Sequence, residues 1–288
     1  MKKSIRVKPD QRTDLLSQGR LHDPFAFLGL HQEQDLFVLR VFQPYASEIS
    51  LIGATGNEKL TRIHADGLFE WHGSQAPKQP YQLSVQIDGK TSLIHDPYSF
   101  PPQISSFDLH LFNEGKLHQG YRVLGSHATQ VNNISGIRFA VWAPNAERVS
   151  VIGEFNHWDG RIHLMAAHGS SGVWELFIPE LTCGVLYKFE IRNRSGALLL
   201  KADPYANEFE VRPGTAARAG VSAAHPWQDE SWLKQRAQWD WLHAPLNVYE
   251  IHVGSWKRHP DGTFYTYREL ASSLIPYLKD MNYPHVEL

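Results

Sequence analysis

The chain has 288 residues, of which 42% are hydrophobic and 20% charged, and its formal net charge is -2 at neutral pH. This composition is typical of a packed protein of two or three domains and excludes an intrinsically disordered chain. The near-neutral charge argues against a nucleic-acid or anionic-membrane partner, because such partners require clustered lysine and arginine. The single Cys183 cannot form an intramolecular disulfide, which favours a reducing compartment.

The N-terminal stretch MKKSIRVKPDQRTDLL (1–16) has adjacent lysines but lacks the apolar core of a secretory signal peptide. No apolar run elsewhere approaches the roughly 18 residues that a transmembrane helix requires. We therefore expect a soluble cytoplasmic protein. The 16 histidines include no HxH or HExxH spacing, so we predict no metal site and no cofactor.

An internal repeat organises the first 212 residues. In chain order, the matched pairs are Leu28-Gly29 with Leu124-Gly125, Pro44 with Pro144, ISLIG (49–53) with VSVIG (149–153), Trp71 with Trp174, Tyr81 with Tyr187, and Asp96-Pro-Tyr with Asp203-Pro-Tyr. The offset between copies drifts only from 96 to 107. Because chance similarity would not preserve this order, each copy of about 100 residues is predicted to be a domain.

Within both copies, short segments alternate apolar and polar residues with a period of two. These segments are LFVLRVF (36–42), YQLSVQI (81–87), IRFAVWA (137–143), VWELFIP (173–179) and YKFEIRN (187–193). Turn residues separate them at intervals of about ten residues, as in antiparallel β-sandwiches. The predicted fold is therefore mainly β, with two tandem immunoglobulin-like sandwiches over residues 1–107 and 108–228.

Residues 229–288 have a different pattern, and we assign them to a linker and a third domain. After a polar connection at GTAARAGVSAAHPWQDE (214–230), LNVYEIHVGSW (246–256) predicts a short apolar strand. TYRELASSLIPYLKDM (266–281) predicts a helix, with Leu270, Leu274, Tyr277 and Leu278 on one face. Thr266 and Glu269 form a predicted capping box at its start. HVEL (285–288) begins another strand, which completes a βαβ unit.

Several of these segments resemble the α-amylase-type glycoside hydrolases of family 13, and more narrowly the bacterial glycogen branching enzymes. VYEIHVGSW and YRELASSLIPYLKDMNYPHVEL are similar to the first strand, helix and second strand of that family's catalytic barrel. DPFAFLGLH (23–31) resembles the start of the branching enzymes' N-terminal module. FAVWAPNAERVSVIGEFNHWDG (139–160) resembles their starch-binding-type module, CBM48.

The resemblance implies a transferase that cuts α-1,4-glucan and reattaches the fragment as an α-1,6 branch in glycogen biosynthesis. Such retaining chemistry uses two carboxyl groups about 5–5.5 Å apart, and in this family they lie beyond the third barrel strand. A (β/α)8 barrel needs about 250 residues, whereas residues 246–288 supply only its first βαβ unit. We therefore assign no catalytic residue, and we expect this N-terminal portion alone to be inactive.

The resemblance also implies an α-glucan partner for the second copy. Trp158, in the turn GEFNHWDG (153–160), is similar to the module's sugar-stacking residue, and Lys188 to its donor to sugar hydroxyls. Asn156 is a further candidate polar contact. The stretch ALLLKADP (197–204) lacks the second tryptophan that related modules carry, so packing of Trp158 against the barrel or the linker remains an alternative.

Two other functions compete with that of a branching enzyme. One is a stand-alone, non-catalytic glucan-binding module, and the other is a debranching or trehalose-releasing hydrolase. The tandem copies and DPFAFLGLH favour branching. The corresponding turn of the first copy, LIGATGNEK (51–59), contains no tryptophan, which predicts a spacing role for that copy. The sequence makes no prediction of oligomeric state.

Overall fold

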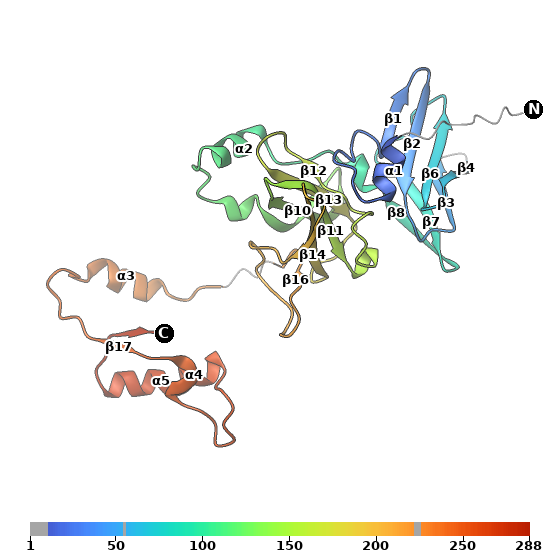
Figure 1. Ribbon diagram of the computed structural model, residues 1–288. Helices are drawn as coiled ribbons and strands as arrows, with labels where there is room; N and C mark the ends of the chain where they lie inside the picture. The colour runs from blue at the N-terminus through green and yellow to red at the C-terminus, as the bar shows by residue number, and fades with distance from the viewer. Residues whose placement is uncertain (1–10, 54–55, 222–225) are drawn as a thin grey trace, which may run out of the picture. The chain divides into compact units, whose positions relative to one another are not determined.

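The computed structural model describes residues 11–53, 56–221 and 226–288, and the chain divides near residue 223 into two compact units (Figure 1). Antiparallel strands make up most of the described elements and the helices are short, which confirms the mainly-β prediction. The described helices include none long and apolar enough to cross a membrane. The prediction that residues 1–16 are not a signal peptide concerns mostly residues 1–10, which lie outside the described residues. Residues 222–225 of the predicted polar connection also lie outside them.

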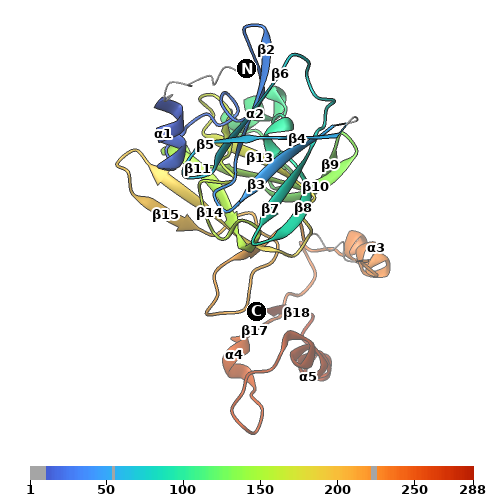
Figure 2. The ribbon, with the colours of Figure 1, turned by 90° about the vertical axis from the view of Figure 1, so that its right-hand side faces the viewer.

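The first sandwich consists of two four-stranded antiparallel sheets, with strand orders β1-β2-β6-β5 and β4-β3-β7-β8 (Figure 2). The strands are β1 (Gly29–Glu33), β2 (Leu36–Phe42), β3 (Glu48–Gly53), β4 (Gly56–Lys59), β5 (Thr61–His64), β6 (Leu68–Gly73), β7 (Gln82–Ile87) and β8 (Lys90–His95). Alternate residues of both sheets, such as Leu39 and Trp71 from one and Leu51 and Leu83 from the other, share one core.

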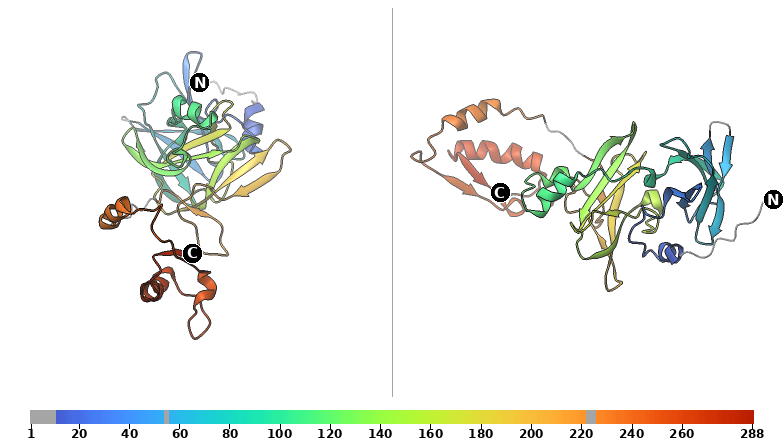
Figure 3. Two further views of the ribbon diagram at one scale, coloured as in Figure 1. Left: turned by 90° about the vertical axis from the view of Figure 1, so that its left-hand side faces the viewer. Right: turned by 90° about the horizontal axis from the view of Figure 1, so that it is seen from above.

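The second sandwich repeats this arrangement, with strand orders β12-β13-β10-β9 and β11-β14-β15. Its strands are β9 (Gly125–Val131), β10 (Ile134–Trp142), β11 (Ala146–Gly153), β12 (Ala166–Ala167), β13 (Val173–Pro179), β14 (Leu186–Asn193), β15 (Leu198–Lys201) and β16 (Ala217–Arg218), which pairs with β14. In the right-hand view of Figure 3, the first sandwich is coloured blue to cyan and the second green to yellow. The repeat found in the sequence therefore corresponds to a repeated strand order.

The repeated Asp-Pro-Tyr segments make the same buried hydrogen bond in both sandwiches. Tyr81 donates its hydroxyl to Asp96 at 2.5 Å, and Tyr187 donates to Asp203 in the second copy. In each copy the other carboxylate oxygen accepts the backbone N–H two residues further on, at 3.1 Å and 2.8 Å. These bonds satisfy two carboxylates that are almost completely buried.

The repeated Leu-Gly pairs pack against the tyrosines of these same segments. Gly29 and Gly125 have φ angles of +83° and +100°, a region that side chains with a Cβ rarely adopt. A Cβ on Gly29 would lie 3.0 Å from the Tyr98 carbonyl oxygen, and one on Gly125 would lie 3.0 Å from the Tyr205 Cβ. Each copy therefore needs glycine at this point.

The two sandwiches share a buried boundary. Leu16 from α1 (Gln11–Ser17), Phe27, Phe42 and Leu68 pack together with Leu164 from the second sandwich. The segment leading into α2 (Ser106–Asn113) is held by Glu175, which is buried on β13 and accepts the backbone N–H groups of residues 103 and 104 at 2.7 and 3.0 Å. The boundary is therefore packed and hydrogen-bonded rather than a loose linker.

The smaller unit contains α3 (Glu230–Gln238), β17 (Val248–Glu250), α4 (Val253–Trp256), α5 (Tyr267–Asp280) and β18 (His285–Glu287). β17 and β18 pair in parallel and α5 connects them, so the predicted βαβ unit is confirmed. The capping box is also confirmed, because Glu269 accepts the Thr266 backbone N–H at 2.8 Å and the Thr266 hydroxyl accepts that of Glu269 at 3.4 Å.

The strand predicted over residues 246–256 is too long. β17 ends at Glu250, and residues 253–256 form the helical turn α4. This turn brings the Trp256 indole N–H within 3.1 Å of the Tyr249 hydroxyl, and both rings join the core formed with α5. Side-chain packing across the turn therefore outweighs the strand propensity of this apolar run.

The buried Asp96 carboxyl predicts a pH dependence of stability. Burial raises its pKa from 3.8 to about 6, against the opposing effect of its two hydrogen bonds. The folded state then binds this proton more tightly than the unfolded state, so the stabilisation is full below about pH 4 and is lost as the pH rises through 6. Urea unfolding should show that Asp96→Asn loses less stability between pH 5 and 7 than the native chain does. Equal losses for the two proteins would contradict this assignment.

Candidate functional site

Trp158 lies in the turn that leaves β11 at the edge of the second sandwich. The chain makes one 3-10 turn over Glu154–Asn156, after which His157 and Trp158 both have positive φ angles, of 56° and 58°. The Trp158 backbone N–H closes the turn on the Gly153 carbonyl at 2.8 Å. The Trp158 side chain is 38% exposed, whereas Trp174 in the core of the same sandwich is 3% exposed.

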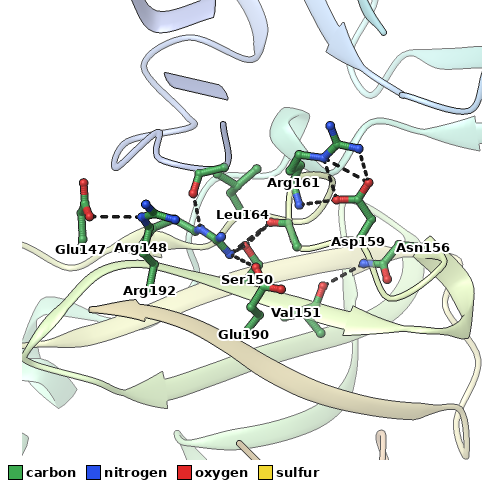
Figure 4. Close-up of polar contacts among 12 residues, drawn as sticks. Glu147, Arg148, Ser150, Val151, Asn156, Asp159, Arg161, Leu164, Glu190 and Arg192 are labelled. Carbon is green, nitrogen blue, oxygen red and sulfur yellow. Dashed lines mark hydrogen bonds and ion pairs between the residues drawn. The ribbon is translucent and has the colours of Figure 1, made fainter. Parts of the chain in front are cut away.

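Asn156 supports this turn from the inside. Its side chain is 1% exposed, and its oxygen accepts the Gly153 backbone N–H at 2.9 Å. Its amide nitrogen donates to the Val151 carbonyl at 2.8 Å, a contact visible in Figure 4, and to His163 Nδ1 at 2.9 Å. Burial lowers the pKa of His163 to about 4, which keeps the ring neutral and able to accept. The structure therefore places Asn156 beneath the turn, with its polar atoms bonded within the protein.

Lys188 lies on β14, the strand that pairs with β11. It stands opposite Ile152, one residue before β11 ends, and its neighbours Tyr187 and Phe189 are buried in the core. Because side chains alternate along a strand, Lys188 projects from the outer face of the sheet. Its ammonium group donates to the Thr215 hydroxyl at 2.7 Å. Lys188 is thus on the strand next to the one that leads to Trp158, and its ammonium is directed to Thr215.

Asp159 and Arg161 complete the turn. Arg161 binds both carboxylate oxygens of Asp159, with its closest contact at 2.7 Å, as Figure 4 shows. Burial of Asp159 opposes its ionisation, but the hydrogen bonds and charge of Arg161 outweigh this effect and lower the pKa of the carboxyl. Asp159 therefore acts as a fixed anion that holds the turn.

Tyr45 is a neighbour of this turn that the sequence reasoning missed. It belongs to the connection between β2 and β3 in the first sandwich, and its hydroxyl donates to Asp159 Oδ2 at 3.2 Å. Its ring centre lies 4.5 Å from that of His157. No local pattern could have identified it, because the contact joins residues more than 100 positions apart.

Two further segments from the sequence analysis differ between the copies. In the first sandwich the chain passes from β3 to β4 in a tight hairpin, with Gly53 paired to Gly56 and residues 54–55 outside the described part. The second sandwich instead has the long turn that carries Trp158. Within the stretch 197–204, residues Leu198–Lys201 form β15, and its leucines 198–200 are exposed.

The turn thus carries an exposed aromatic cluster beside polar groups, because Trp158 and His157 belong to the turn and the Tyr45 ring packs on His157. An aromatic face presents apolar surface on which the C–H groups of a sugar ring can pack, while neighbouring donors bind its hydroxyls. Because buried hydrogen bonds hold the turn, such a ligand would meet a surface that is already shaped. The cluster is thus suited to binding a carbohydrate.

Two family models match successive parts of the chain. Residues 9–98 match the family model for the alpha-1,4-glucan branching enzyme GlgB N-terminal domain. Residues 123–206 match carbohydrate-binding module 48, the isoamylase N-terminal domain. The chain is 56% identical, over 98% of its length, to the 1,4-alpha-glucan branching enzyme GlgB of Nitrosospira multiformis, and 55% identical over 97% to that of Nitrosomonas europaea. It spans only 39% and 38% of these relatives. The resemblance inferred from the sequence is confirmed.

Solved structures are less similar. Pullulanase type I from Bacillus subtilis has a TM-score of 0.40 and 17% identity, with 90% of this chain and 36% of that chain covered. A putative alpha amylase from Salmonella typhimurium has a TM-score of 0.38 and 21% identity, with 57% and 24% covered. Likenesses at this level indicate no function.

The buried position of Asn156 predicts a structural role that can be measured. Asn156→Ala leaves the Gly153 N–H and the Val151 carbonyl without partners, which should lower the free energy of unfolding by roughly 1–3 kcal/mol. Urea denaturation checks this value. Asn113→Ala, at the exposed end of α2, is the matched control and should change stability by less than about 0.5 kcal/mol. Equal effects of the two substitutions would show that Asn156 does not support the turn.

Proposed function

We propose that this chain binds α-glucan for a branching enzyme, since it corresponds to the N-terminal part of bacterial 1,4-alpha-glucan branching enzymes. The whole enzyme would transfer α-1,4-glucan segments to form α-1,6 branches in glycogen biosynthesis. Two family models match in tandem, and the curated relatives are similar along nearly the whole chain. The proposed partner is an α-glucan, the proposed location is the cytoplasm, and no cofactor is required.

The proposed architecture follows from the repeated strand order. Residues 1–107 and 108–228 would be two immunoglobulin-like sandwiches, and residues 229–288 a linker followed by the start of a catalytic (β/α)8 barrel. The parallel pairing of β17 with β18 around α5 supports the last assignment, because this is the repeating element of such barrels. The active site of such a barrel forms at the C-terminal ends of several strands, so no residue of this chain is proposed as catalytic.

Glucan binding is proposed for the second sandwich, and the position of Trp158 carries this proposal. Trp158 is partly exposed in a turn held by Asn156 and Asp159, inside the segment that matches carbohydrate-binding module 48. The indole would stack on a glucose ring. Lys188 would exchange its hydrogen bond to the Thr215 hydroxyl for hydrogen bonds to sugar hydroxyls. Asn156 would contribute indirectly by fixing the turn.

Replacement of Trp158 tests this proposal. Trp158→Ala should weaken the apparent affinity for glycogen at least about fivefold, because it removes the stacking surface. Native electrophoresis in gels that contain glycogen measures the retardation. Trp142→Ala is the control, since Trp142 is half-exposed on β10 in the other sheet. If the Trp158 variant is retarded as strongly as the native chain, its indole does not bind glucan.

The activity of the 288-residue chain is a separate test. We expect it to leave amylose unbranched, because the chain spans about two fifths of the branching enzymes that it matches. Iodine staining of amylose measures branching by the loss of colour. A loss above that of a protein-free blank would place catalytic groups within these residues.

A further inference from the structure

Tyr45 contacts both sequence neighbours of Trp158. Its ring packs at 4.5 Å from the His157 ring with an interplanar angle of 57°, and its hydroxyl donates to Asp159 at 3.2 Å. These contacts place a tyrosine of the first sandwich against the turn that carries Trp158, the proposed glucan platform of the second. Tyr45 nevertheless remains 43% exposed, as much as Trp158 itself.

The position of Tyr45 relative to this turn is fixed from several sides. Asp159, which accepts its hydroxyl, is held by three hydrogen bonds from the Arg161 guanidinium. That guanidinium also lies 5.9 Å from the centre of the Phe42 ring, at the end of the strand that leads to Tyr45. The hydroxyl edge of Tyr45 is therefore anchored at the boundary between the sandwiches.

An anchored but exposed ring has the properties of a sugar platform. A tyrosine that served only to join the two sandwiches would gain most by burying its ring, because buried apolar area stabilises contacts. Tyr45 instead uses its hydroxyl for the junction and leaves much of its side chain open to solvent. Ordering costs little on binding when the ring is already held.

We propose that Tyr45 extends the Trp158 platform across the boundary, so that a linear α-1,4-glucan contacts both sandwiches. This inference rests on the proposed glucan binding of the second sandwich. A short oligosaccharide would occupy Trp158 alone, whereas a longer chain would also pack on Tyr45. The first sandwich thereby contributes to selection for chain length, although its own β3–β4 hairpin carries no tryptophan.

Calorimetric titration of the full 288-residue chain with maltotriose and with maltoheptaose tests this inference. Tyr45→Ala should weaken maltoheptaose binding about three- to tenfold, as expected for one lost stacking contact, and change maltotriose binding by less than about twofold. Tyr45→Phe keeps the ring against His157 but loses the hydroxyl anchor to Asp159, so it should retain more of the maltoheptaose preference than Tyr45→Ala does. The ratio of the two affinities is the decisive quantity, because partial unfolding lowers the active fraction for both sugars equally.

Trp158→Ala and Tyr121→Ala complete the experiment. Tyr121 is an exposed tyrosine on the 3-10 turn before β9, and its removal should leave both affinities unchanged. Trp158→Ala could weaken the binding of both sugars while Tyr45→Ala leaves the ratio of the two affinities unchanged. In that case the proposed extension to Tyr45 is wrong, and glucan binding by Trp158 stands. If Trp158→Ala binds both sugars as the native chain does, the proposed glucan site itself is wrong. If Tyr45→Phe loses the maltoheptaose preference as completely as Tyr45→Ala does, the hydroxyl rather than the ring produces this preference. The proposal that the Tyr45 ring extends the Trp158 platform is then wrong.

Discussion

The buried guanidinium of Arg148 is the constraint on which the joined sandwiches depend. Its side chain is 2% exposed, and a charge removed from water is tolerated only when it is paired and hydrogen-bonded. Arg148 meets this requirement with Glu190 at 2.7 Å, the Ser150 hydroxyl at 2.8 Å and the Gly19 carbonyl at 3.0 Å (Figure 4). The last of these belongs to the segment that follows α1. The second sandwich therefore supplies the counter-charge of Arg148, and the N-terminal segment supplies the acceptor of its Nε–H.

The same cluster constrains the candidate site. Gly160 offers its carbonyl to Arg148 at 3.3 Å, and a Cβ at this position would lie 2.0 Å from Glu190 Oε1. The turn that carries Trp158 is thus fixed at its far end by the junction and at its near end by Asn156. A loop supported in this way is held in one shape by a rigid scaffold. Tyr45 then meets the turn from the first sandwich because the junction sets where that sandwich lies.

The two copies share a fold but differ in the turn at one strand end. Both keep the buried Tyr–Asp hydrogen bond, and in both the Leu-Gly pair contacts the tyrosine that follows the aspartate. They differ where β3 and β11 end, since one copy closes in a hairpin and the other in a long turn with an exposed tryptophan. Because this turn lies outside the sheets, it can change while the sandwich remains stable.

The sequence by itself determined the repeat, most strands of both sandwiches, and the capped helix α5, because period-two alternation and capping are local patterns. It also predicted that Trp158 lies in a turn rather than in the core, since a core tryptophan is unusual among glycine and asparagine residues. Only the tertiary structure decided that Asn156 is buried, that β17 ends early to let Trp256 pack, and that Tyr45 lies against the turn that carries Trp158. These features depend on which segments, far apart in the chain, meet after folding, and burial and hydrogen bonding across such contacts leave no periodic trace in the sequence.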